Sequence, residues 1–190
     1  MTKQIAFFVK MSAIVNVWKA MAGYAQDIKD MLGMLAMAQV AIETGWLQAP
    51  IGNNLSGIKG HIAKYGYVVR ETAEVINGET VHEAGEFQVY PSTAAWLADY
   101  IGVQTSHVAV MNAIPFGWEA CCVALGPLTD DDKARMAAHP PLPPLHSEYS
   151  SSPTYPGVMK EIIAENRLFD PLVLAWYASG ANPANRPPGG

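Results

Sequence analysis

The sequence predicts an α+β fold that is mainly α, with a helical lobe and a small β-hairpin lobe. Two observations carry this prediction. The stretch Met31–Ile42 is apolar nearly all round, which in a soluble protein indicates a buried central helix. The pair Asn77-Gly78 lies between two β-forming runs and is the strongest short-range signal of a hairpin. Helix-start and helix-break signals on both sides of the hairpin indicate that the rest is mostly helical.

Length and composition are those of a single folded domain. The chain has 190 residues, half of them hydrophobic, which is enough to bury a core. We expect one domain over residues 1–180 and a disordered tail over 181–190. The net charge is -5, from 12 Lys and Arg against 17 Asp and Glu, and no basic run occurs. Nothing therefore favours a nucleic-acid partner or an anionic membrane surface.

The segment Met1–Ala22 predicts an amphipathic helix. Three lysines interrupt its apolar residues, so it lacks the long apolar core of a signal peptide or a membrane span. We expect no signal peptide and no membrane-spanning helix. The inward face of this helix carries apolar residues at helical spacing: Ile5, Phe8, Val15 and Trp18.

The central helix carries one carboxylate close to its end. Glu43 follows the apolar stretch, and Gly45 is placed to end the helix. Burial penalises the charged form of a carboxyl group, and the helix dipole disfavours a negative charge at a helix C-terminus. Both effects raise the pKa of Glu43, as a general acid requires. The alternative is a glutamate that merely ends an apolar helix and faces water.

The β lobe is expected over about 61–90. Runs rich in Tyr, Val and Thr supply the strands on both sides of Asn77-Gly78. Period-two alternation along the first strand puts Thr72, Glu74 and Ile76 on one face. One face of the hairpin can therefore look towards the helical lobe.

Two helical segments follow the β lobe. Ser92 is a suitable N-cap for a helix over Thr93–Ile101. Residues 108–125 also show a helical pattern, but Pro115 and Gly117 interrupt it. We therefore expect two short helices in that segment.

The remaining elements are short. Thr129 and the three aspartates after it resemble a capping box, for a helix that ends near His139. The proline-rich run 140–144 enforces an extended loop. A last helix is expected over about 157–166.

Cysteines and histidines give no metal-ligand pattern. Cys121 and Cys122 are adjacent, a spacing typical of neither a metal site nor a disulfide framework. We expect reduced, half-buried thiols there, with a vicinal disulfide as the alternative. We expect no metal and no cofactor, because none of the histidines shows metal-ligand spacing: His61, His82, His107, His139 and His146.

Several sequence blocks follow one another in a fixed order, and blocks in a fixed order are more specific than any single one. The blocks are Ala38–Trp46, Asn54–Lys59, Thr72–Glu74 with Asn77-Gly78, Phe87–Ser92, Asp99-Tyr100 and Tyr149–Pro156. This order resembles glycoside hydrolase family 73, which contains bacterial autolysins, flagellar rod-associated wall hydrolases and phage lysins. The resemblance covers roughly Leu32–Asn166. Ser152 stands where the family has Asp, and the segment 126–148 is longer than the family needs.

The resemblance implies a lysozyme-like fold with a glycan groove between the lobes. It also implies an endo-β-N-acetylglucosaminidase, which cleaves the β-1,4 bond after N-acetylglucosamine in peptidoglycan. Glu43 would protonate the leaving glycosidic oxygen. Glu74 would be the second carboxylate, with Glu71 or Glu79 as substitutes if the position is misassigned, and Tyr149 would lie near the cleaved bond.

The same resemblance implies a set of substrate-binding residues. The alternative for its aromatic members, and for Trp118, is core packing, while the Asn and Gly members are also typical of turns. The set is Trp46, Asn54, Ser56, Gly57, Lys59, Tyr90 and Tyr155.

Two other functions remain open at this point. A muramidase or lytic transglycosylase on the same fold also uses a helix-end glutamate, but it typically has a Gly-Leu-Met-Gln block where Asn54–Lys59 stands here. The other is a non-catalytic wall-binding or virion structural module. The expected partner is the glycan strand of the bacterial cell wall. We expect the protein to be a monomer. An immunity protein would be a further partner if the chain is a secreted toxin.

Overall fold

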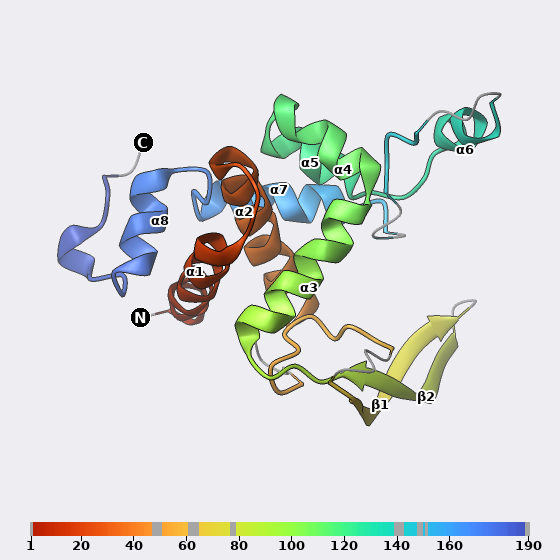
Figure 1. Cartoon of the computed structure of the whole chain (residues 1–190), viewed down its shortest axis with the longest axis horizontal. Coiled ribbons are helices and arrows are strands. Elements are labelled where there is room, and N and C mark those ends of the chain that lie inside the picture. Colours follow the sequence, from red (N-terminus) through yellow and green to blue (C-terminus); the bar gives the residue numbers. More distant parts are fainter. Residues whose placement is uncertain are drawn as a thin grey trace.

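The computed structural model describes residues 2–46, 51–60, 65–76, 79–138, 143–147, 150 and 152–188, with backbone alone at 72–76, 79 and 183. These residues form eight α-helices, two short 3-10 helices and one antiparallel sheet of two strands. Helices make up the body of the molecule, and the hairpin extends from one side of it (Figure 1). The predicted mainly-α α+β fold is confirmed.

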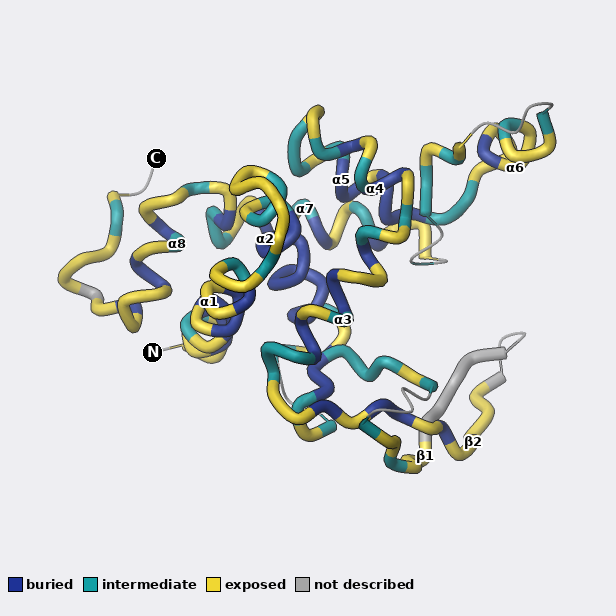
Figure 2. Tube along the Cα trace, viewed as in Figure 1, coloured by how far each residue is buried: buried dark blue, intermediate teal, exposed yellow. Residues whose placement is uncertain are grey.

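The first two helices build the centre of the helical lobe. Helix α1 spans Lys3–Met21 and α2 spans Gln26–Glu43. Ten consecutive residues of α2, from Leu32 to Ala41, are buried, so the predicted central helix is confirmed. Figure 2 shows this segment in the interior, with α1 buried along one side only. No helix in the described parts of the chain is both long and apolar enough to cross a membrane.

Three of the four residues predicted on the inward face of α1 are buried, and the buried face includes further residues. Phe8, Val15 and Trp18 are buried, whereas Ile5 is only partly buried against the core. The buried face also includes three apolar residues that fill the spaces between them: Phe7, Met11 and Ile14.

The β lobe is a single hairpin joined to the helices through a loop. Strands β1, Tyr67–Ile76, and β2, Glu79–Gln88, pair in antiparallel register, with Tyr67 opposite Gln88 and Ile76 opposite Glu79. The predicted hairpin is confirmed, although its turn pair 77–78 lies outside the described residues. The loop 51–60 runs along β2 and forms a bridge between Lys59 and Phe87.

Helices α3 to α5 follow the hairpin. Helix α3 spans Thr93–Ser106, and the Ser92 side chain accepts a hydrogen bond from Ala95 N at 3.1 Å, as an N-cap does. The helix runs beyond the predicted end at Ile101, and Gln104 in this extension is buried. Helices α4, Val108–Ala113, and α5, Trp118–Ala124, are separated by a 3-10 turn over Ile114–Phe116. The predicted break is thus confirmed.

Helix α6, Asp130–Ala137, projects from the body of the molecule (Figure 1). Its predicted capping box is present between Thr129 and Asp132. Asp132 is fully buried and also accepts hydrogen bonds from the backbone N–H groups of Leu145 and His146. The buried carboxylate of Asp132 therefore joins α6 to Leu145 and His146, in the segment that is longer than the family needs.

Two helices end the chain, one of which the sequence did not predict. Helix α7 spans Tyr155–Glu165, close to the expected bounds, and α8 spans Pro171–Ala178. The Asp170 side chain caps α8 by accepting a hydrogen bond from Leu172 N at 2.9 Å. An aspartate followed by a proline is a helix-start signal, so the sequence held the information for α8.

The described part of the C-terminal tail contacts the residues before it. Trp176 Nε1 donates a hydrogen bond to Asn182 O at 2.7 Å, and Arg167 Nη1 donates one to Pro188 O at 2.6 Å. The Arg186 guanidinium lies 5.9 Å from the Trp176 ring centroid. These contacts join the tail to α8 and to Arg167, and the expected disorder of residues 181–190 stays a prediction.

The two cysteines are free thiols in the core. Cys121 and Cys122 are both fully buried on α5, more deeply than the half-buried state that we predicted. Burial raises the pKa of each thiol to about 12, so both remain protonated and unreactive at neutral pH.

Candidate active site

The end of α2 presents Glu43 at the surface of the helical lobe. Glu43 is the last residue of the helix, and Thr44 forms the C-cap. The Thr44 hydroxyl donates a hydrogen bond to Val40 O at 2.5 Å. Trp46 N donates another to Ala41 O at 3.1 Å. These bonds satisfy carbonyl groups that the helix end leaves open, so the backbone beneath Glu43 is fixed.

Trp46 holds the turn that follows. Gly45 and Trp46 have φ angles of 54° and 68°, in the left-handed region that is costly for a residue with a side chain. The Trp46 ring makes edge contacts with Phe7 and Phe8 of α1, at centroid distances of 5.4 and 5.7 Å. This packing gives Trp46 a structural task, and its contact with substrate stays a prediction.

A pocket of about 280 Å³ opens beside Glu43. It is lined by Glu43, by Ser56 and Ile58 of the loop, and by Tyr100 and Val103 of α3. Ile58, Tyr100 and Val103 were not among the predicted substrate-binding residues, although Ile58 and Tyr100 belong to blocks that carry the family resemblance. Tyr100 and Val103 are three residues apart, a spacing that places both side chains on one helix face.

The surroundings of Glu43 set its proton affinity. Glu43 is exposed as a whole residue, while its carboxyl group is partly covered by protein beside the pocket. Burial raises the pKa of Glu43 above its ordinary value of 4.5, and a hydrogen bond from Tyr155 opposes this rise. Tyr155 Oη donates to Glu43 Oε1 at 3.4 Å. Tyr155 is 7% exposed and contacts Glu43 through this bond, while its contact with substrate stays a prediction.

Asn54 organises the loop rather than the surface of the pocket. Its side chain is fully buried and donates hydrogen bonds of 3.0 Å to Ile58 O and to Gln88 O. Its Oδ1 accepts another from Ile58 N at 2.9 Å. These bonds give Asn54 a role in holding the loop, and a direct contact of Asn54 with substrate stays a prediction.

Ser56 and Gly57 lie where the loop meets the pocket. Ser56 lines the pocket, and its Oγ accepts a hydrogen bond from Trp96 Nε1 at 3.0 Å. Gly57 has a φ of 65°, a conformation that favours glycine. A side chain at this position would also meet the Phe87 ring, at 3.7 Å from its Cβ. The loop thus places Ser56 close to Glu43.

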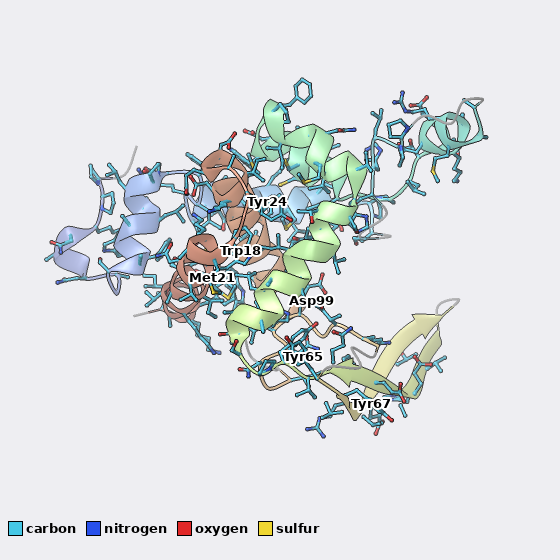
Figure 3. All side chains as sticks on the ribbon, viewed as in Figure 1. Trp18, Met21, Tyr24, Tyr65, Tyr67 and Asp99 are labelled. Carbon is cyan, nitrogen blue, oxygen red and sulfur yellow. The ribbon has the colours of Figure 1, made fainter. Side chains whose placement is uncertain are left out.

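Tyr90 joins the β lobe to α3. It is 2% exposed, and its hydroxyl lies 2.6 Å from Gln88 Oε1 and 2.5 Å from Asp99 Oδ2. Burial, and then the neighbouring Asp99 carboxylate, raise the pKa of Tyr90 far above its usual range. Figure 3 shows Asp99 on α3 and Tyr65 beside it, and the Tyr65 ring lies 6.1 Å from that of Tyr90. Tyr90 therefore has a structural role at this junction, and its contact with a sugar stays a prediction.

The hairpin carries position 74 on the face that meets the loop. The backbone of Glu74 pairs with that of Val81, so position 74 shares its face with positions 83 and 87. Of these, Phe87 is buried under the loop, and Glu83 lies 3.7 Å from Lys59 Nζ in an exposed ion pair. Lys59 therefore connects the loop to this face of the hairpin.

The other predicted site residues fall outside this arrangement. Tyr149 lies outside the described residues. Glu71 is exposed on the opposite face of the hairpin, 3.1 Å from His82 Nδ1. Trp118 stacks on Phe169, away from the pocket. Within the described residues, no three His, Cys, Asp or Glu side chains are grouped to hold a metal ion.

Comparison with solved structures finds the same fold. The glycoside hydrolase domain of FlgJ from Salmonella typhimurium is 22% identical, with a TM-score of 0.58 over 86% of this chain and 97% of that chain. The catalytic domain of the autolysin Auto from Listeria monocytogenes is 16% identical, with a TM-score of 0.62 over 88% of this chain and 86% of that chain. The chain therefore has the fold of peptidoglycan hydrolase domains of this type, as the resemblance in sequence predicts.

A third solved structure with this fold is named for a different enzymatic activity. An N-acetylmuramoyl-L-alanine amidase from Staphylococcus aureus is 16% identical, with a TM-score of 0.59 over 94% of this chain and 48% of that chain. The match covers about half of the amidase chain, so the name of the amidase describes a longer protein than the shared domain. No family model and no curated protein matches this sequence.

Proposed function

We propose that this protein is a peptidoglycan hydrolase that cleaves the β-1,4 bond after N-acetylglucosamine, with Glu43 as the general acid. The observation that carries the proposal is the position of Glu43 at the end of a buried helix, beside a pocket between α3 and the loop 51–60. The fold shared with glycoside hydrolase domains supports it.

The chemistry of glycoside hydrolysis requires a proton donor beside the leaving oxygen. An alkoxide is a poor leaving group, so the acid has to be protonated when the bond breaks. Burial raises the pKa of Glu43 and so favours its protonated form. The open side of the carboxyl group faces the pocket, where a glycosidic oxygen can approach.

Glu74 is the proposed second carboxylate, which activates water or stabilises the positive charge of the transition state. The register of the hairpin supports this choice, because position 74 shares a face with the residues that meet the loop, while Glu71 belongs to the other face. Tyr149 is proposed to orient the reacting groups near the cleaved bond, on the resemblance in sequence alone. We propose the glycan strands of the bacterial wall as the substrate and the wall as the place of action.

Mass spectrometry of the products from purified peptidoglycan tests the bond. Products that end in reducing N-acetylglucosamine are expected. Reducing N-acetylmuramic acid would indicate a muramidase, and its 1,6-anhydro form would indicate a lytic transglycosylase. Released stem peptides with intact glycan strands would indicate an amidase, and no release at all would indicate a non-catalytic module. Each of these four results contradicts the proposed bond.

A further inference from the structure

A second pocket lies at the other end of α2. Its volume is about 450 Å³, and it lies between the N-terminal half of α2 and two aromatic rings, those of Trp118 and Phe169. Met31 lines this pocket and precedes Glu43 by twelve residues, which is about 18 Å along a helix axis. The second pocket is therefore separate from the candidate active site.

The two rings form a stepped apolar surface. They are nearly parallel, at an interplanar angle of 4°, and their centroids are 5.9 Å apart, so they overlap only partly. Phe169 is 50% exposed, although a large aromatic side chain gains from burial. An exposed ring at the edge of an apolar pocket is typical of a binding site.

Both rings are held by well-defined turns. Trp118 begins α5 directly after Gly117, whose φ is 95°. Phe169 precedes Asp170, which caps α8 and pairs with Arg167. Because these turns fix the backbone, little conformational entropy is lost when a ligand packs on the rings.

Hydrogen-bonding groups lie at the rim of the same pocket. Asp30 accepts hydrogen bonds from Lys19 Nζ at 2.6 Å and from Gln26 Nε2 at 2.9 Å. Asp27 is exposed, and its carboxylate makes no hydrogen bond or ion pair with the described side chains that line the pocket. A carboxylate accepts hydrogen bonds from hydroxyl and amide groups. The site thus offers aromatic faces for an apolar ring surface and acceptors for polar groups at its edge.

We propose that this second pocket, defined by Trp118, Phe169 and Asp27, binds an N-acetylated amino sugar of the glycan strand. One face of the sugar ring packs on Phe169 and Trp118, the acetyl methyl group enters the apolar part, and a hydroxyl group donates to Asp27. The identity of the ligand rests on the proposed function, because the sugar belongs to the same polymer. The second pocket would thus be an additional binding site for the insoluble substrate.

Binding is tested by titrating the Glu43→Gln variant, which cannot consume the ligand, with a tetramer of N-acetylglucosamine. The probe is the indole N–H signal of Trp118 in a nitrogen-15 spectrum, assigned among the five tryptophans by Trp118→Phe. A saturable shift of this signal is expected, and Phe169→Ala should weaken its apparent affinity about 10-fold, or ~1.4 kcal/mol. The matched control is Phe116→Ala, because Phe116 is 79% exposed and lines a different pocket.

A binding assay with insoluble peptidoglycan separates this inference from the proposed function. Phe169→Ala should bind the wall several-fold more weakly yet cleave short soluble fragments at the wild-type rate, whereas Glu43→Gln should bind but not cleave. If the wild-type protein cleaves nothing, the proposed function fails, while a saturable shift at Trp118 still supports the sugar site. The site is overturned if the Trp118 signal does not move up to about 10 mM tetramer, or if it moves equally in Phe169→Ala.

Discussion

Tyr155 donates a hydrogen bond to Glu43 Oε1 at 3.4 Å, across 112 residues of sequence. Tyr155 is the first residue of α7, and Glu43 is the last residue of α2, so the bond joins two helix ends. The hydroxyl stabilises the charged form of Glu43, while burial stabilises the neutral form. Tyr155 thus limits how far burial raises the pKa of the proposed acid.

Tyr155→Phe should raise the pKa of Glu43 further, because it removes the group that stabilises the carboxylate. Activity that depends on a protonated Glu43 is lost as the pH rises through this pKa. The alkaline limb of the pH–rate profile should therefore move to higher pH in the variant. Reducing-end release measured across pH checks this, and a limb that moves to lower pH contradicts it.

The raised pKa of Glu43 also predicts a pH-dependent cost in stability. The folded state holds the Glu43 proton more tightly than the unfolded chain, so stability falls as the pH rises from about 4.5 through the folded pKa. Glu43→Gln has no such proton and should melt at a higher temperature than wild type at pH 7. The difference should shrink below pH 4.5. Thermal unfolding followed by circular dichroism measures the melting temperatures of both proteins at the two pH values. A Glu43→Gln variant that melts at a lower temperature than wild type at pH 7 refutes the predicted cost of the Glu43 charge.

The hairpin offers a matched set of carboxylates. If Glu74 assists the reaction, Glu74→Gln should reduce turnover by at least about 100-fold, the lower range for such groups. Glu71→Gln should stay within about 2-fold of wild type, because Glu71 is exposed on the opposite face of the hairpin. Initial rates on purified peptidoglycan decide, and a larger loss at Glu71 or Glu79 would move the second carboxylate to that position.

Asp132 should control the stability of the projecting segment. Burial alone would raise its pKa, but hydrogen bonds from Thr129, Leu145 and His146 lower it well below the usual range. This contribution to stability is present above about pH 3.8 and is lost as the pH falls through the folded pKa.

Asp132→Asn should reduce the free energy of unfolding by about 2–3 kcal/mol at neutral pH, because buried hydrogen-bond donors lose a charged acceptor. Asp131→Asn is the control, since Asp131 is exposed on the same helix. Urea unfolding checks the difference. Equal stabilities of the two variants would show that the Asp132 hydrogen bonds contribute no net stability.

Local signals explain which elements could be predicted from sequence. The cap at Ser92 and the break at Pro115 depend on residues close together in the chain, and the structure has both in their expected places. The two strands on either side of Asn77-Gly78 are also present. The position of Glu43 at the end of a buried helix could be predicted in the same way, because the apolar run and the helix end are both readable along one segment.

Contacts between distant segments could not be predicted from the sequence. Tyr90 and Asn54 belong to motifs that resemble a substrate site, and one is buried against Asp99 and the other against the backbone of Gln88. A sequence pattern marks such residues as important without showing whether they touch the ligand or hold the residues that do. The contacts of the tail with Trp176 and Arg167 are of the same kind.

The most direct test of Glu43 as the general acid is the rate at which Glu43→Gln releases reducing ends from purified peptidoglycan. The account predicts a loss of at least about 1,000-fold, within the range for removal of a general acid. Binding of the variant to the same material should be retained, because the amide keeps the shape of the carboxyl group. A variant that folds, binds and cleaves at the wild-type rate would contradict the account.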